Sequence, residues 1–395
     1  MQGHFFFLLV HIAVSAAFEQ QYFFPLSAAR IPDDKIAHTI LARALDDGID
    51  LSAFAFSGPA LHEIVFWSHW NESAEFPRAL LEPGQNATTI DVHAHYAPEW
   101  YGDIRQDNTV WTLRNQLTHM ANQSIAESIF SIPNPNIFLG DKNATLAIAR
   151  LLNENMATLA RVLPRRFGFF ATTPLPYTDA SIVEAKYALD SLGALGVALS
   201  SNHEGHYLGD ALFTPFFTEM DNKHAIIFVH PIEPLLKVNE TFVKANPTVY
   251  SPVLAEFYFE TARTFLDLAL SQTLTNFSSL DFIIPHLGGS FLSIIDRSIP
   301  PSQLLDDVMA ALRRRCWWDS AGLTYGHQLG GLLAYDISPT FLLYGSDYPY
   351  IPSSLVDASS KAIEESPFLN MTQKREVKSR NALGLFAGRK RDENL

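Results

Sequence analysis

Short apolar runs alternate with longer stretches of helical periodicity from about residue 88 onward, and this alternation limits most strongly what the chain can fold into. Apolar runs rich in Val, Ile and Phe that alternate with helical stretches predict parallel strands, each followed by a helix. Eight runs can be counted, at 89–95, 126–132, 167–173, 195–200, 225–230, 280–286, 316–321 and 340–347. Apolar residues with helical spacing lie between them, for example at 146–163, 181–192 and 257–274. Eight such units in about 300 residues predict an α/β fold that closes into a (β/α)8 TIM barrel.

The residues before the first predicted strand form two segments. Phe5 to Phe18 is an apolar stretch with the small residues 15–17 near its end, which is typical of a signal peptide at 1–17. It is too short to span a bilayer, so no membrane span is expected. Residues 18–87 are an N-terminal extension to which the sequence assigns no task. Pro32 to Asp34 predicts the start of a helix there, and Gly48 predicts its end.

Glycosylation sequons add to the prediction of a secretory-pathway protein. Seven Asn-x-Ser/Thr sequons occur, where chance pairing would give about two, at Asn71, Asn86, Asn122, Asn143, Asn239, Asn276 and Asn370. We therefore expect a secreted glycoprotein, with Asn86 and Asn370 as the preferred sites because they lie near expected element boundaries. A cytoplasmic enzyme with an apolar N-terminal helix is the alternative. The lone Cys316 is predicted to be a buried thiol.

The charge balance excludes nucleic acid as an expected partner. The chain carries a formal charge of −14, and no cluster of Lys or Arg stands out beyond residues 313–315. With 47% hydrophobic and 18% charged residues it can bury a large core.

Two histidines, His93 and His95, end the first predicted strand. Side chains alternate along a strand, so both imidazoles point to the same face, which in a barrel is the interior mouth. Imidazoles that converge in this way begin a site for zinc or a similar ion. About half of lone His-x-His pairs bind no metal, so the residues at the other strand ends must show whether a metal site is present.

Three more polar residues stand where predicted strands run out. His230 follows the apolar run 225–229, His286 follows 282–285, and Asp347 follows 341–346. Ligands and catalytic groups of a (β/α)8 barrel lie at these carboxyl ends and come from several strands. Five polar residues at corresponding strand ends predict a metal and acid–base site at the barrel mouth.

The segments around these residues resemble signatures of the amidohydrolase-related decarboxylases. The group includes aminocarboxymuconate-semialdehyde decarboxylase, γ-resorcylate decarboxylase and the fungal 6-methylsalicylate decarboxylases. The matching segments are Ile90-Asp91-Val92-His93-Ala94-His95, Phe228-Val229-His230-Pro231, Pro285-His286-Leu287-Gly288-Gly289 and Tyr344-Gly345-Ser346-Asp347-Tyr348-Pro349. Softer matches lie at 207–210, 259–263, 319–321 and 380–386. The resemblance runs from about residue 88 to 388, within an expected barrel of 88–390.

The resemblance implies one divalent metal held by His93, His95, His230 and Asp347, with His286 beside it as an acid–base residue. The His-x-His form resembles the zinc members of the group, and manganese is the alternative. The two-metal members use a carboxylated lysine at the end of the fourth strand. Residues 195–202 contain no lysine, so the resemblance implies a single-metal site.

The resemblance also implies non-oxidative decarboxylation of a small aromatic or enol acid, with 6-methylsalicylate as the preferred substrate. Asp347 is expected to donate the proton, with His286 as its partner. One alternative is a metal-dependent hydrolase of a lactone or amide on the same site. Another is a secreted protein that binds a ligand without turnover.

Substrate contacts are harder to predict than metal ligands. Trp111, Tyr207 and Tyr348 lie near strand ends and are expected to flank a flat substrate. Arg114 and Arg263 lie in helical stretches, where a surface ion pair is the preferred interpretation. The expected binding partner is a small-molecule carboxylate substrate. Whether the chain forms a homodimer is left open.

Overall fold

The structure is a computed structural model that describes residues 30–70, 78–105, 109, 111–133, 137–239, 241–245, 248–322 and 326–387. The predicted signal peptide at 1–17 and Asn71 lie outside these residues. No helix in the described ranges is long and apolar enough to cross a membrane.

Eight parallel strands form the central sheet, as the sequence predicted. In spatial order they are β1 (Thr89–His95), β2 (Ile125–Ser131), β3 (Phe167–Thr172), β4 (Gly196–Ser200), β7 (Ile226–His230), β10 (Asp281–Ile284), β11 (Cys316–Asp319) and β12 (Leu342–Leu343). Parallel bridges join Asp91 to Tyr344 and Ala94 to Tyr348, so the last strand returns to the first. The chain therefore folds as a (β/α)8 barrel.

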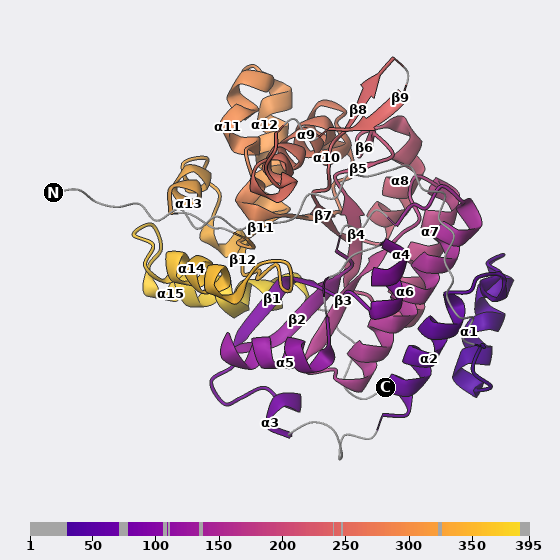
Figure 1. Cartoon of the computed structure of the whole chain (residues 1–395). Helices are drawn as coiled ribbons and strands as arrows, with labels where there is room; N and C mark the ends of the chain where they lie inside the picture. Colours follow the sequence, from indigo (N-terminus) through magenta and orange to yellow (C-terminus); the bar gives the residue numbers. More distant parts are fainter. Residues whose placement is uncertain are drawn as a thin grey trace.

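Helices surround the barrel on the outside, as Figure 1 shows. Those between barrel strands are α4 (Glu99–Arg105), α5 (Leu113–Asn122), α6 (Lys142–Val162), α7 (Thr178–Tyr187), α8 (Thr214–Asn222), α9 (Glu256–Leu270), α10 (Thr273–Asn276), α11 (Phe291–Ser298), α12 (Gln303–Arg314) and α13 (Gly326–Leu333). Three long helices begin at side chains that cap a free backbone amide. Thr112, Asp141 and Ser302 accept from the third residue of α5, α6 and α12.

Several predicted elements are shorter than their sequence pattern, and in two of them a turn or a break in the backbone is the reason. The strand expected at 340–347 is reduced to Leu342–Leu343, because Pro339–Phe341 forms a 3-10 turn before it. The helix expected at 257–274 is broken at Gln272, which has a φ of 63°, into α9 and α10. Two small hairpins extend from loops that follow barrel strands, namely β5 (Asn202–His203) with β6 (His206–Tyr207), and β8 (Leu235–Val238) with β9 (Thr241–Lys244).

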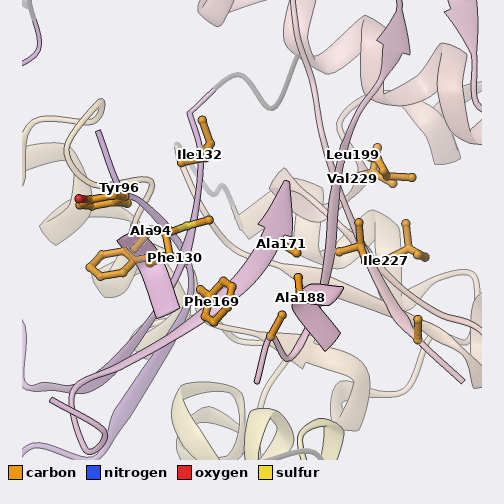
Figure 2. Packing of buried hydrophobic residues seen from close by; sticks show 14 of the residues in the cluster. Ala94, Tyr96, Phe130, Ile132, Phe169, Ala171, Ala188, Leu199, Ile227 and Val229 are labelled. Carbon is orange, nitrogen blue, oxygen red and sulfur yellow. The ribbon is translucent and has the colours of Figure 1, made fainter. Parts of the chain in front are cut away.

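Alternation along the strands separates two apolar cores. Ala171, Leu199 and Ile227 belong to a cluster that also holds helix residues such as Leu159, and Figure 2 shows these strand residues from close by. Neighbouring residues such as Phe170 and Phe228 belong to a second cluster inside the barrel. Helix α16 (Asn381–Leu385) and the following Phe386 complete this inner cluster.

The N-terminal extension packs against the barrel. It contains α1 (Lys35–Asp46), α2 (Ser57–Ser68) and α3 (Arg78–Leu81), and α1 begins at the capping residue Asp34 as predicted. Ile40, Leu61 and Ile64 are buried in the same core as the outer faces of the strands. Helix α2 lies along α6 (Figure 1). Residues 30–70 are therefore integrated with the barrel.

The barrel mouth combines strand ends with the α4 and α9 segments. The C-terminal helices α14 (Ser353–Glu364) and α15 (Met371–Arg375) lie on the side of β12 and β1 in Figure 1.

Candidate metal and acid–base site

The four predicted metal ligands meet at the barrel mouth. His93 and His95 lie at the end of β1, His230 ends β7, and Asp347 follows β12. One ligand atom from each lies within 4.8 Å of the others, and all four residues are buried. Residues separated by more than 250 positions in the chain thus form one cluster.

His93 is oriented by a second carboxylate. Its Nδ1 lies 3.0 Å from Oδ2 of Asp319, and both side chains are fully buried. Its Nε2 is buried without a hydrogen-bond partner among the described residues and lies 3.7 Å from Oδ1 of Asp347. A histidine held by a carboxylate on one ring nitrogen, with the other nitrogen free, is the usual arrangement of a metal ligand.

Asp319 is itself fixed by backbone amides. Its Oδ1 accepts from the amide of His286 at 3.1 Å and from the amide of Ala321 at 2.9 Å. Burial acts to raise the pKa of Asp319, but the neighbouring His93 outweighs it and holds the pKa below its usual value. The carboxylate is therefore charged and directed at the His93 ring. Sequence analysis assigned no role to Asp319, although it is also a polar residue at a strand end.

His95 and His230 are held in the uncharged form that binds metal. Burial lowers the pKa of His95, whose Nδ1 lies 3.1 Å from the Ser131 hydroxyl. Burial and the other histidines lower the pKa of His230 well below its usual value. A lone pair is thus present on these imidazoles at neutral pH.

His286 and Asp347 form a pair next to the ligand cluster. His286 Nε2 lies 3.6 Å from Oδ2 of Asp347, and Oδ1 of Asp347 lies 3.0 Å from Nε2 of His95. Burial acts to raise the pKa of Asp347, but contacts with His286 and His95 hold it well below its usual value. Asp347 is therefore ionised in this arrangement.

The backbone at both residues leaves the ordinary strand conformation. His286 has a φ of 54° and Asp347 a φ of 59°, both in the left-handed region that non-glycine residues rarely adopt. Gly322 lies close by, and a Cβ there would stand 3.2 Å from Cδ2 of His286. Strained backbone of this kind concentrates at functional sites, where surrounding contacts maintain it.

A buried hydrogen-bond network supports the loop that carries Asp347. The Ser346 hydroxyl donates to Oδ2 of Asp91 at 2.6 Å, and the Ser346 amide donates to Oδ1 at 3.0 Å. Burial raises the pKa of Asp91 to about 7. Because Asp91 also accepts from the amide of His93 at 3.2 Å, this network connects the first and last strands beneath the ligands.

The ligand set fits one divalent metal ion. Three imidazoles and one carboxylate, buried and within reach of one centre, are typical donors for a single ion. The end of β4 at Ser200 presents no lysine that could bridge two ions.

A cavity of about 360 Å³ opens beside the cluster, and His95, His230 and Asp347 form part of its wall. Apolar side chains make up another part, among them Val253 and Phe257. Arg105, at the end of α4, also lines it. Sequence analysis missed Arg105 because a cation at the end of a seven-residue helix has no strand-end signal.

The three aromatic residues expected to flank the substrate lie outside the lining of this cavity. Trp111 is buried and donates to Gln116 at 3.2 Å. The Tyr207 hydroxyl donates to Glu260 at 2.8 Å. The Tyr348 ring stacks on His119 with 4.0 Å between centroids. Their predicted contact with substrate gains no support from these positions.

The two arginines interpreted as surface residues fit that interpretation. Arg114 is exposed on α5. Arg263 pairs with Glu260 at 2.7 Å and is 42% exposed. Cys316 is buried, and burial raises the pKa of its thiol to about 12, as expected for an inert core cysteine.

All predicted glycosylation asparagines in the described residues are exposed. They are Asn86, Asn122, Asn143, Asn239, Asn276 and Asn370. Asn122, Asn143 and Asn276 fall within helices, whereas Asn86 lies in the loop before β1 and Asn370 caps α15. Asn239 lies between the two strands of the β8–β9 hairpin.

This chain is similar in sequence and structure to known proteins. The model of the amidohydrolase family matches residues 90–387. A 6-methylsalicylic acid decarboxylase of Aspergillus aculeatus is 27% identical over 328 residues, which cover 77% of this chain and 97% of the relative. A decarboxylase of Penicillium terrestre is 29% identical over 324 residues, with 75% and 94% coverage. A solved amidohydrolase structure superposes with a TM-score of 0.70 at 28% identity, covering 76% of this chain and all of that one.

Proposed function

The chain belongs to the amidohydrolase family, and from that premise we propose that it is a metal-dependent decarboxylase of small hydroxylated aromatic acids, with 6-methylsalicylate as the preferred substrate. The observation that carries the proposal is the buried cluster of His93, His95, His230 and Asp347 next to the His286–Asp347 pair. The names of the relatives support the same chemistry.

His93, His95, His230 and Asp347 would hold the metal. Bound there, a divalent ion would chelate the substrate carboxylate with its ortho hydroxyl and stabilise developing negative charge. The three imidazoles and one carboxylate are a donor set that zinc accepts, and we propose zinc, with manganese as the alternative outcome of metal analysis.

Arg105 and the apolar wall supply substrate binding. Arg105 provides a permanent positive charge in the cavity, and within the described chain no carboxylate pairs with it. Val253 and Phe257 offer an apolar surface to the ring. A planar acid with one polar and one apolar edge suits this lining.

The His286–Asp347 pair supplies the proton. Decarboxylation requires a proton on the ring carbon that bears the carboxylate; the C–C bond then breaks, CO₂ leaves, and its bonding electrons restore the aromatic ring. His286 Nε2 lies 3.6 Å from Oδ2 of Asp347, so the two side chains form a coupled pair, and we assign the transferred proton to this pair. That Asp347 is the donor, with His286 as its partner, stays a prediction.

A decarboxylation assay in D₂O tests the proposal. For 6-methylsalicylate we expect CO₂ and 3-methylphenol with one deuterium at the carbon that lost the carboxylate, because the pair exchanges its proton with solvent between turnovers. Mass spectrometry and proton NMR of the product measure the label. The matched substrate without the ortho hydroxyl should react far more slowly.

The hydrolase alternative makes the opposite prediction. A hydrolase would place solvent protons only on exchangeable oxygen or nitrogen, and its product would carry no deuterium on carbon. Cleavage of lactones or amides by the metal-loaded enzyme, with no CO₂ from any hydroxybenzoate or enol acid, would overturn the decarboxylase proposal. Metal content without any turnover would support the ligand-binding alternative.

We also propose that the chain passes through a secretory pathway, and the exposure of the described sequon asparagines supports this. Expression in a eukaryotic host should give a mature N-terminus near Phe18 and a mass that falls on treatment with an N-glycosidase. An intact Met1 without a mass shift would place the enzyme in the cytoplasm.

A further inference from the structure

The N-terminal extension contacts the residue that follows the metal ligands. Tyr96 comes directly after His95 and is fully buried at the end of β1, near Ala94 and Phe130 in Figure 2. Its hydroxyl donates to Oε1 of Glu63 at 3.0 Å. Glu63 belongs to α2, a helix outside the barrel. A polar contact therefore joins the extension to the base of the loop behind β1.

Glu63 is held in place on its own side of this contact. The indole nitrogen of Trp67, one turn later on α2, donates to the same Oε1 at 3.3 Å. Burial and the nearby Glu99 raise the pKa of the Glu63 carboxyl. The sequence assigned no task to residues 18–87, where Glu63 lies. Glu63 is instead a half-buried acceptor at the boundary between extension and barrel.

The loop that starts at Tyr96 makes one wall of the cavity. Ala97, Tyr101 and Arg105 all line it, and the last two belong to α4. Trp100 and Ile104 on the same helix are buried in the core. Because α4 is short, its placement depends on this packing and on its connection to β1, where Tyr96 is fixed.

We propose that Glu63 is a positioning residue for substrate binding: through Tyr96 it holds the α4 segment, and with it Arg105, against the cavity. The part of the inference that concerns a carboxylate substrate rests on the proposed function. The extension therefore contributes to the binding of substrate without touching it.

Tyr96 has a second acceptor, which makes the proposal testable. Oδ1 of Asn155 on α6 lies 3.2 Å from the hydroxyl. When Glu63 is removed, Tyr96 can still donate to Asn155, so its hydroxyl need not be left buried without a partner. We expect the fold to survive while the α4 segment becomes less well held.

The test compares three variants of the full-length, metal-loaded enzyme. Glu63→Ala removes the acceptor, whereas Glu63→Gln keeps an oxygen that can accept from Tyr96. Asp47→Ala is the matched control, because Asp47 accepts from Arg150 of α6 at 2.6 Å and so also joins the extension to the barrel. Arg150 remains paired with Glu184 at 2.9 Å in that variant.

For Glu63→Ala we expect KM for the aryl acid to rise about tenfold, the equivalent of one lost hydrogen bond, with kcat within about twofold and full metal content. Hydrogen exchange in peptides covering residues 96–105 should become faster. Glu63→Gln should lie close to wild type. Asp47→Ala should lower the melting temperature without changing KM or exchange in 96–105.

The inference is overturned if Glu63→Ala and Asp47→Ala give the same KM and the same exchange in 96–105. If the wild type releases no CO₂ from any hydroxybenzoate, the proposed function fails, yet the exchange comparison still decides whether Glu63 holds the α4 segment. Equal loss of activity in Glu63→Ala and Glu63→Gln would also contradict it, because the amide retains the acceptor.

Discussion

The two ends of this barrel are built from the same eight strands but differ in the kind of side chain that closes them. At the amino ends, Phe386 and Leu385 fill the interior against Phe170. At the carboxyl ends, histidines and carboxylates take the corresponding space. At the same end, the Asn381 amide donates to the carbonyls of Pro339 and Leu342 at 2.9 and 2.8 Å.

The mouth, by contrast, contains buried nitrogens that the described residues leave without partners. They belong to His93 at Nε2, His230 at Nδ1 and His286 at Nδ1. Such groups destabilise a fold unless a ligand or substrate satisfies them. The difference teaches that one end of the barrel is optimised for stability and the other for chemistry, which four predictions can test.

Loss of a metal ligand should have the largest effect. His93→Ala or His230→Ala removes one of four donors, so the purified protein should lose most of its roughly one equivalent of metal and its activity. Elemental analysis and the CO₂ assay measure both quantities. Full metal occupancy in both variants would contradict the ligand assignment.

Loss of the acid–base group should have the next largest effect. His286→Ala should retain the metal while activity falls about a hundredfold or more, because His286 contacts Asp347 but is absent from the ligand cluster. The same two assays distinguish this variant from a ligand variant. Metal loss in His286→Ala would make His286 a direct ligand.

Weakening the support of a ligand should have a smaller effect. In Asp319→Asn the one amide oxygen is needed by the backbone amides of His286 and Ala321, so an NH2 group that cannot accept faces Nδ1 of His93. We therefore expect metal affinity to fall about 10- to 100-fold. Competition with a chromophoric chelator measures the affinity. Asp336→Asn is the control, since Asp336 is 85% exposed and pairs with Arg313. Equal affinities in the two variants would mean that Asp319 does not orient His93.

A substitution at the opposite end should have the smallest effect on turnover. Phe386→Ala empties a buried position, so the free energy of unfolding should fall by about 3 to 5 kcal/mol. Metal content and kcat should stay unchanged below the unfolding transition. Phe368→Ala, at a side chain that is 50% exposed, is the control for denaturation by urea. A large drop in kcat for Phe386→Ala would show that the two ends are coupled.

The fold and the ligand cluster could be predicted because both depend on local patterns. Apolar runs of Val, Ile and Phe define the strands, and a polar residue after each run falls at the barrel mouth whichever strands pair. The strand at 340–347 was overestimated because an apolar run does not reveal that Pro339 begins a 3-10 turn.

Contacts between distant segments could not be predicted in the same way. Trp111 and Tyr348 lie near strand ends, but only the fold determines that one packs on Tyr96 and the other on His119. Glu63 gave no signal in the sequence because its partner, Tyr96, is 33 positions away. Among these residues, Asp319 could have been identified from the sequence, because it is a polar residue at the end of β11, just as the metal ligands stand at the ends of their strands.

The closure between β12 and β1 has a consequence for how the chain is made. The two strands are separated by almost the whole barrel sequence. Helix α16, which fills the barrel interior at the amino ends of the strands, follows both of them in the chain. Contacts of such large sequence separation form late and slowly, because the long intervening chain must first be brought together. During translation the apolar inner faces of the earlier strands therefore remain exposed until residues 342–386 have emerged from the ribosome. Recombinant yield should consequently depend on chaperone supply and on slow synthesis at low temperature more than on the final stability of the enzyme.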